Sequence, residues 1–121
     1  MEYNLIEKIE GLEQLHFLRV LNLAKNKIEK IENLDELKCL RVLKLDSNMI
    51  TKIEGLDSLD SLEELNLSYN SIKKIENLRG LRHIKKIWLS DNKIEIVENL
   101  TGFPNLSYID LRKCVCMQEE I

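Results

Sequence analysis

A 22-residue period runs through the chain and constrains its fold more than any other feature. Full copies occupy residues 12–33, 34–55, 56–77 and 78–99. Residues 1–11 match the second half of a copy, and residues 100–121 form a last copy with several altered positions. A fixed period of this length is typical of a solenoid, in which each copy forms one coil that stacks on its neighbours. The sequence therefore predicts a single repeat domain over residues 1–121.

Each copy contains a short segment in which apolar residues alternate, as in residues 21–23. This alternation predicts a strand with one face in the core. Ile28 and Ile31 then carry the chain back along the other side of the coil, and residues 34–40 are expected to form a short helical or 3₁₀ segment that leads to the next strand. The fold class is therefore α/β, with one strand per coil.

Two further columns have structural explanations. One column contains Asn4, Asn26, Asn48, Asn70 and Asn92. An Asn at a fixed turn can bond backbone groups that the bend leaves unpaired, so we interpret this column as a structural ladder. The other column contains Gly11, Asn33, Gly55, Asn77 and Asn99. Gly and Asn tolerate positive φ, so this column predicts a left-handed turn.

Composition narrows the classes of function. The chain has 18 Lys and Arg and 21 Asp and Glu, a net charge of −3, with the two signs well mixed. We expect neither nucleic-acid nor membrane binding from this balance. The start MEYNLIEKIE lacks the basic and apolar blocks of a signal peptide, which predicts a cytoplasmic or nuclear protein that is not secreted. Cys39, Cys114 and Cys116 are read as reduced thiols rather than a disulfide framework.

No catalytic or cofactor motif is recognisable. The four Gly are scattered at turns, so they form no phosphate-binding loop. His16 and His83 lie between strand segments, without a nucleophile or a metal-ligand spacing nearby. We therefore expect no enzymatic activity, no cofactor and no metal.

The motifs IEKIENL, ITKIEGL and IKKIENL, within the pattern LxxLxxLxLxxNxIxxIExL, resemble leucine-rich repeats. The 22-residue form is most similar to the subclass typified by the nuclear regulatory subunit of protein phosphatase 1. The resemblance implies a right-handed curved solenoid with a parallel sheet on the concave side and short 3₁₀ or helical segments on the convex side. It also implies a protein partner.

The predicted partner site lies on the concave face, where the outward strand residues vary from copy to copy. Besides the two outward positions within each strand, we expect the column of Ala24, Asp46, Ser68, Ser90 and Arg112 to point outward. Trp88 is the only Trp, and its register points it outward. Exposed Trp, Tyr and Arg are typical of binding hot spots. The predicted contact residues are Trp88, Tyr108, Tyr69, Lys86, Asp110 and Arg112. The alternative is that Trp88 only covers strand surface by packing on the aliphatic stems of Lys44 or Lys86.

Two hypotheses of function follow. The first is a non-catalytic interaction module that regulates a protein phosphatase, because Trp88 in WLSDN is similar to a Trp in the WLxxN context of that subclass. Its other concave acidic and aromatic positions are Val42, Lys44 and Asn66 here. The second is a structural segment of a larger ciliary or cytoskeletal scaffold. Both ends of the repeat array look uncapped, which predicts self-association.

Overall fold

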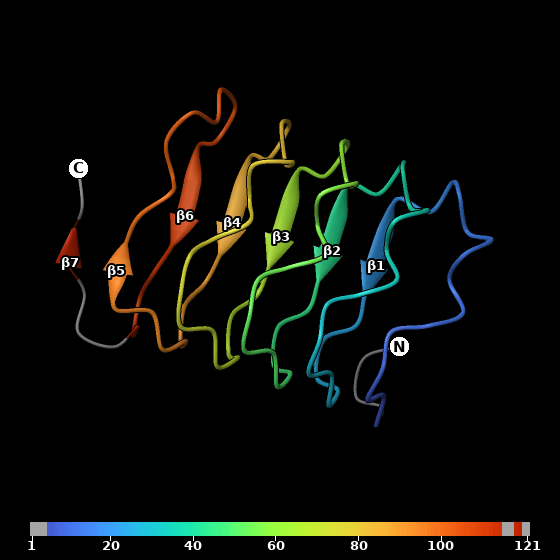
Figure 1. The fold of residues 1–121 in the computed structure, drawn as a ribbon, viewed down its shortest axis with the longest axis horizontal. Coiled ribbons are helices and arrows are strands. Elements are labelled where there is room, and N and C mark those ends of the chain that lie inside the picture. Colours follow the sequence, from blue (N-terminus) through green and yellow to red (C-terminus); the bar gives the residue numbers. More distant parts are fainter. Residues whose placement is uncertain (1–4, 115–117, 120–121) are drawn as a thin grey trace.

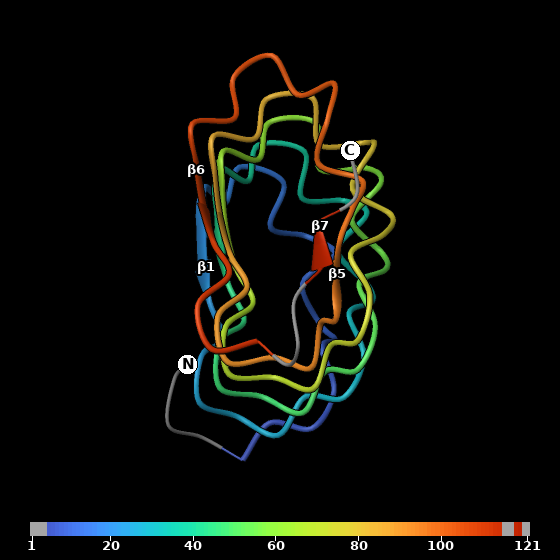
Figure 2. The same ribbon diagram turned by 90° about the vertical axis from the view of Figure 1, so that its left-hand side faces the viewer.

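The structure is a computed structural model that describes residues 5–114 and 118–119. Successive coils lie side by side and surround a common interior (Figures 1 and 2). Each coil contributes one short parallel strand to a five-stranded sheet in the order β1-β2-β3-β4-β6. The strands are β1 (Val20–Asn22), β2 (Val42–Lys44), β3 (Glu64–Asn66), β4 (Lys86–Trp88) and β6 (Tyr108–Asp110). On the opposite side, β5 (Ile96–Val97) pairs in parallel with β7 (Gln118–Glu119).

The strand register follows the sequence period. Leu21 pairs with Leu43, Leu43 with Leu65, and Leu65 with Ile87, so every neighbouring strand is displaced by one repeat. The middle residue of each strand points inward, and Leu43, Leu65 and Ile87 are completely buried. The predicted parallel sheet and the predicted inward positions are thus confirmed.

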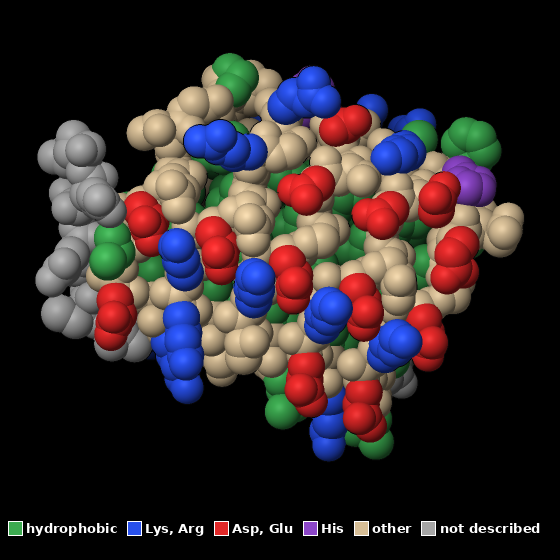
Figure 3. Space-filling view, viewed as in Figure 1, with side chains coloured by type: hydrophobic (Ala, Val, Ile, Leu, Met, Phe, Trp, Pro, Cys, Tyr) green, Lys and Arg blue, Asp and Glu red, His purple; other side chains and the backbone are tan. Residues whose placement is uncertain are grey.

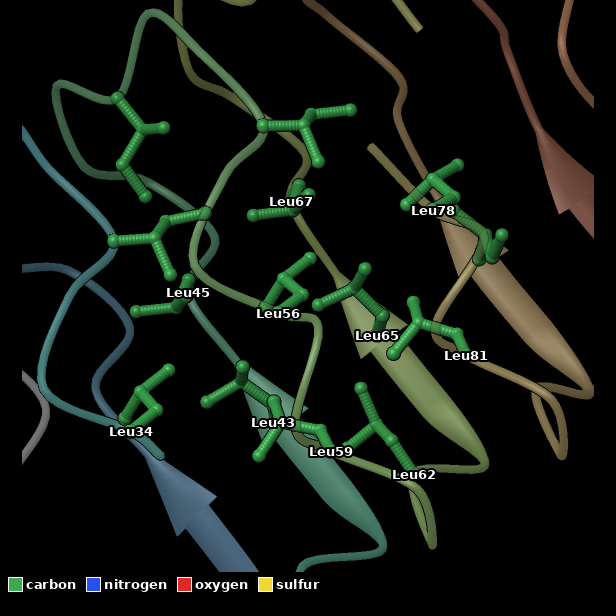
Figure 4. Packing of buried hydrophobic residues seen from close by; sticks show 14 of the residues in the cluster. Leu34, Leu43, Leu45, Leu56, Leu59, Leu62, Leu65, Leu67, Leu78 and Leu81 are labelled. Carbon is green, nitrogen blue, oxygen red and sulfur yellow. The ribbon is translucent and has the colours of Figure 1, made fainter. Parts of the chain in front are cut away.

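The core is built from stacked columns of Leu and Ile. Figure 4 shows Leu43, Leu65 and neighbouring leucines from successive coils pointing into the same interior space. Ile28 and Ile31, on the return side of the coil, are also fully buried. Burying a side chain of this size contributes about 1.5–3 kcal/mol relative to leaving it exposed. Since each coil buries its side chains against its neighbours, stability comes from the stack.

The predicted helical segments are not confirmed, because the described residues contain no helix. Residues 34–40 form two successive turns instead. The amide of Leu37 donates to the carbonyl of Leu34 at 3.1 Å, and the amide of Leu40 donates to that of Leu37 at 3.2 Å. A helix needs several fixed residues before its first bonds stabilise it. The burial of Leu34, Leu37 and Leu40 every third residue is satisfied by these turns alone.

The Asn column forms the predicted ladder between coils. The Nδ2 of Asn70 donates to the carbonyls of Leu45 and Leu67 at 3.0 Å, and its Oδ1 accepts from the amide of Ile50 at 2.9 Å. Asn48 and Asn92 repeat this pattern. These bonds satisfy backbone groups that the turn leaves unpaired, which is required in a buried position. Asn4, the first member of the column, lies outside the described residues.

The last described member of this column is a cysteine. Cys114 donates its thiol to the carbonyl of Leu89 at 3.3 Å, as the Asn residues do in earlier coils. Burial raises the pKa of the Cys114 thiol. A thiol offers one weak donor, whereas an Asn amide offers two donors and an acceptor. Cys116 lies outside the described residues.

The predicted left-handed column is also confirmed, with positive φ at all five positions. At Gly55 the conformation has a second reason, because an added Cβ would lie 2.6 Å from the carbonyl oxygen of Ile31. Asn77 uses its side chain instead, donating from Nδ2 to the carbonyl of Ile53 at 2.8 Å. The structure contains a second left-handed column that the sequence did not predict: Lys25, Ser47, Tyr69, Asp91 and Lys113.

Candidate functional site

The outer side of the five-stranded sheet is the candidate site, and we call it the strand face. Its members are the first and third residues of each strand: Val20, Asn22, Val42, Lys44, Glu64, Asn66, Lys86, Trp88, Tyr108 and Asp110. They point outward because side chains alternate along a strand and each middle residue points into the core. These positions hold the variable residues of each repeat.

A third column that we expected to point outward does not do so. Ala24, Ser68 and Ser90 are 4%, 5% and 8% exposed, so the prediction is wrong for these residues. The chain bends directly after each strand, and the hydroxyl of Ser90 donates to the hydroxyl of Ser68 at 2.9 Å. Small side chains are suited to this bend. Only Arg112, the last member of the column, is exposed.

Two of the predicted site residues form an aromatic pair. The ring centroids of Trp88 and Tyr108 lie 5.7 Å apart, with the ring planes tilted by 53°. The pair joins β4 to β6 across the C-terminal end of the strand face. Trp88 is half-buried and Tyr108 is 43% exposed. Aromatic pairs at this separation attract each other, so each ring restricts the position of the other.

Asp110 and Arg112 form an ion pair beside these aromatics. Arg112 donates from Nε to Oδ1 and from a terminal nitrogen to Oδ2, both at 2.9 Å, and its amide donates to Oδ1 at 3.1 Å. The hydrogen bonds from Arg112 lower the pKa of Asp110, and the same contact raises the pKa of Arg112. Asp110 is only 5% exposed, so its carboxylate is already occupied. Arg112 remains exposed.

The other two predicted residues stand apart. Lys86 is exposed beside Tyr108 in the register of β4 and β6. Tyr69 is 58% exposed on the bend after β3. Its amide donates to the carbonyl of Ser90 at 3.0 Å, which fixes the backbone but leaves the ring in solvent.

A hollow of about 350 Å³ lies in the middle of the strand face. The side chains that line it belong to Val42, Lys44, Glu64, Asn66 and Trp88, on three neighbouring strands. Of these, only Trp88 was among the predicted contact residues. The signal that could have identified the others is their register, because each occupies an outward position next to the column of Trp88 or of Lys86. The hollow places an apolar wall beside a lysine and a carboxylate.

The side of the molecule turned to the viewer in Figure 1 is covered by mixed charge. Figure 3 shows acidic and basic side chains alternating across the coils of this face. By the 22-residue period, Lys30 and Lys52 align with Ile96 of β5, and Glu32 and Glu54 lie two residues later, so these columns run along the side of the coils opposite the five-stranded sheet. None of the three ion pairs found within the described residues joins these columns. The charges are therefore solvated, as is usual for an exposed row.

A second hollow, of about 420 Å³, opens at the first described coil. Core residues Ile9, Leu12 and Leu23 line it, together with Leu5. Leu5 is 74% exposed, which places a large apolar side chain on the surface at this hollow. Among the described residues, no further coil covers the core at this hollow.

The described residues contain no group of three or more His, Cys, Asp or Glu placed to hold a metal ion. His16 and His83 are both exposed, and Nδ1 of His83 lies 2.8 Å from the carbonyl oxygen of Asp60. In the described part of the chain, no helix has the length and hydropathy needed to cross a membrane.

Comparison with known families identifies the repeat. The family model described as "Leucine Rich repeats (2 copies)" matches residues 17–58, 38–80 and 60–101, which together span more than half of the chain. The chain belongs to the leucine-rich repeat family. No curated protein matches the chain. Leucine-rich repeat domains are generally non-catalytic modules that mediate protein–protein interaction, and the coil geometry here is that of the family.

Solved leucine-rich repeat structures share the fold over almost the whole chain. The functional domain of InlJ from Listeria monocytogenes matches with a TM-score of 0.84 and 22% identity, covering 99% of this chain and 26% of InlJ. Internalin InlF from the same organism matches with a TM-score of 0.84 and 25% identity, covering 99% of this chain and 35% of InlF. The ectodomain of the receptor kinase SOBIR1 from Arabidopsis thaliana matches with a TM-score of 0.71 and 26% identity, covering 89% of this chain and 64% of SOBIR1.

This chain therefore spans between about a quarter and two thirds of the length of these solved structures. The comparisons identify the leucine-rich repeat family and its fold. The narrower resemblance to the phosphatase regulatory subclass stays a prediction.

Proposed function

We propose that the chain binds a protein partner through its strand face, with the pair Trp88 and Tyr108 as the main anchor. The observation that carries the proposal is the 5.7 Å separation of these two ring centroids on the outer side of a sheet whose inward residues are buried in β1 to β4. Large aromatic side chains on a surface are costly unless a partner covers them, and they dominate the energetics of interfaces. Lys86, Arg112 and Tyr69 extend the same surface.

The test is a paired capture from native extract with the wild-type chain and the double variant Trp88→Ala, Tyr108→Ala, read by mass spectrometry. We expect a protein that the wild type retains and the double variant loses, because truncating a central aromatic anchor costs about 2 kcal/mol or more. Phe17→Ala is the matched control, since Phe17 is an exposed aromatic residue away from the strand face. Circular dichroism must show that all variants keep the fold. Identical captures from all three proteins would refute the proposal.

Within this proposal, a phosphatase catalytic subunit is the partner class that the resemblance favours. Its support is the WLSDN segment, whose Trp88 lies outward on β4 next to the exposed Lys86. The check is a titration of purified phosphatase catalytic subunit against the wild type and the same double variant. Absence of binding at micromolar concentrations would remove this partner while leaving the strand face as the proposed site.

The alternative is a structural segment of a ciliary or cytoskeletal scaffold that also self-associates. The observation that favours it is the apolar end at the first described coil, where Leu5 is exposed beside a hollow that reaches the core. Light scattering compares the wild type with Leu5→Asp. If the end mediates contact, the wild type associates with rising concentration and the variant stays monomeric. A wild type that is monomeric throughout would count against this alternative.

We also propose that the protein works in the cytoplasm or the nucleus. Cys39 and Cys114 are both free and half-buried, which suits a reducing compartment. Fluorescence imaging of a fusion at the C-terminus checks this, and accumulation of the full-length fusion in culture medium would contradict it.

A further inference from the structure

Charge is distributed unevenly between the strand side of the coils and the rest of the chain. The strand segments with their flanking residues are 19–25, 41–47, 63–69, 85–91 and 107–113. They contain eight Lys or Arg and five Asp or Glu, a net charge of +3, whereas the whole chain has a net charge of −3. The remaining residues therefore carry a net charge of −6. The strand side of the protein is therefore basic, although the net charge of the whole chain is negative.

Exposure increases this asymmetry. All eight basic residues of these segments are exposed, and none of the five acidic residues is. Two of the acids are already occupied, since Asp110 is bound by Arg112 at 2.9 Å and Glu63 lies 3.5 Å from Lys85. Arg41, Lys44 and Lys86 form no ion pair with the described residues. A ligand that approaches this side meets mainly unpaired cations.

The hollow in the strand face offers mainly hydrogen-bond donors. Lys44 presents an ammonium group, and Trp88 presents an indole N–H that has no partner among the described residues. Asn66 uses its Oδ1 to accept from the amide of Ser68 at 3.0 Å, so its Nδ2 is left to donate outward. Glu64 is the one acceptor side chain of the hollow, and Val42 supplies an apolar wall opposite Trp88. The complementary ligand is rich in acceptors and has an apolar centre.

We propose that the strand face binds an extended acidic peptide segment, in which an apolar side chain enters the hollow and carboxylates on either side pair with Lys44 and Lys86. The inference rests on the proposed function and names the chemistry of its partner. Strands lie about 4.8 Å apart, so β2 and β4 are separated by roughly 10 Å. Lys44 is the third residue of β2 and Lys86 is the first residue of β4, so the diagonal between them is roughly 12 Å. An extended peptide rises about 3.3 Å per residue and its side chains alternate between two faces, so two acidic residues four positions apart and the apolar residue midway between them all face the sheet.

Glu64 favours a peptide over another polyanion. Glu64 is on β3, which lies between the strand that carries Lys44 (β2) and the strand that carries Lys86 (β4). At this place its carboxylate would repel a phosphate. A peptide crossing the hollow presents backbone N–H groups, which can donate to this carboxylate. A nucleic acid presents a continuous line of negative charge and gains nothing from it.

The test uses the full chain, labelled with ¹⁵N, and synthetic peptides added to millimolar concentration. The first peptide has a central Phe with one Asp two positions before it and another two positions after it, and the second has Asn in place of both Asp. We expect shifts of amide signals in β2, β3 and β4 with the Asp peptide, and binding at least about fivefold weaker with the Asn peptide, because two surface ion pairs are lost. Equal binding of the two peptides, or none at all, would overturn the proposal.

Charge reversal supplies the matched comparison. Lys44→Glu with Lys86→Glu should weaken binding of the Asp peptide by about tenfold or more, and added salt should reduce this difference. Lys52→Glu with Lys74→Glu makes the same change of net charge on the opposite side of the coils and should have no effect. A short single-stranded oligonucleotide is the third ligand. If it binds more tightly than the Asp peptide, the face recognises polyanions in general and the proposal fails.

The proposed function and this inference can fail separately. If Trp88→Ala with Tyr108→Ala loses the captured partner while the two lysine reversals retain it, the strand face is the site but its partner is not acidic. If none of these variants changes the capture, both proposals fall.

Discussion

The interior columns and the strand face are made by the same short strands, yet they differ in almost every property. Leu43, Leu65 and Ile87 occupy one interior column and are completely buried. Val42, Glu64 and Lys86, one residue earlier in each strand, form a strand-face column with no shared chemistry. Every coil presents the same packing problem to its interior neighbours, so one side-chain type suits all coils. Residues on the outer face do not pack against the next coil in the interior, so their side chains can differ from coil to coil.

Positions that repeat between coils contribute to stability, whereas positions that vary between coils are the candidates for binding. Repetition along a column marks a position whose role is to hold the next coil, as for the Asn ladder. Departure from repetition, as at Trp88, marks a position that packing does not fix. Paired substitutions test this distinction, and the expected effects run from an interior leucine, through the Asn ladder, to an ion pair of the strand face.

The largest effect is expected from Leu65→Ala in the middle of β3. Leu65 is completely buried, so the change should lower the free energy of unfolding by about 3 kcal/mol through lost burial and the cavity left behind. Glu64→Ala, the adjacent outward position, should change it by less than about 0.5 kcal/mol. Urea unfolding followed by circular dichroism measures both. Similar losses for the two variants would break the distinction between the faces.

Asn70→Ala should be the next most damaging. It leaves the amide of Ile50 without its partner inside the protein and removes one of the two side-chain donors to the carbonyl of Leu45, which keeps the bond from Asn48. An unsatisfied buried polar group costs about 1–3 kcal/mol, so we expect a loss of about 2 kcal/mol. Asn66→Ala removes only a local bond to the amide of Ser68 at the surface of the sheet and should cost about 0.5 kcal/mol. An equal loss of unfolding free energy for the two variants would contradict a specific stabilising role of the Asn ladder.

Cys114→Asn should stabilise the protein by about 1 kcal/mol, because it extends the Asn ladder by one coil and adds net hydrogen bonds. The thiol now makes one bond, to the carbonyl of Leu89 at 3.3 Å. Cys39→Ser is the control, since Cys39 is half-buried outside the Asn column, and it should be nearly neutral. Thermal unfolding of the reduced proteins compares them. A lower melting temperature for Cys114→Asn would mean that the last coil does not accept the ladder geometry.

The smallest effect concerns the strand face alone and depends on pH. The pKa of Asp110 is lowered by Arg112, so the contact stabilises the folded state above the unfolded pKa of about 3.9 and this contribution is lost as pH falls through the folded value. Arg112→Ala should therefore be less stable than wild type at neutral pH, and the gap should narrow in acid. Lys113→Ala should show no such narrowing. Denaturant unfolding at neutral and acidic pH measures the difference in unfolding free energy between the wild type and each variant. A difference for Arg112→Ala that does not change with pH would contradict the prediction.

Much of the fold could be predicted from the order of residue types. The period placed each strand in register, and the column of Gly11, Asn33, Gly55, Asn77 and Asn99 indicated one of the two left-handed columns that the structure contains. The short helical or 3₁₀ segment expected at residues 34–40 was not confirmed, because Leu residues three apart fit successive turns as well as a helix. Periodicity records which residues face inward. It does not distinguish two backbone conformations that give the same spacing.

Less of the candidate site could be predicted. Register placed Trp88 and Tyr108 on the outer face, and the structure brings their rings together. Register also placed Asp110 there, but its carboxylate is covered by Arg112. The sequence did not indicate the hollow lined by Val42, Lys44 and Asn66, because these residues belong to different repeats and form the hollow only when their strands lie side by side.

The sequence by itself determined the coil length, the parallel pairing of the strands and the composition of the interior columns. Each of these repeats in every copy, because hydrophobic burial and backbone hydrogen bonding impose the same requirement on each coil. Only the tertiary structure decided which outer side chains meet, which charges are paired and where the sheet is hollowed. These features depend on contacts between residues one or two repeats apart, and their geometry is set by the stacking of the coils.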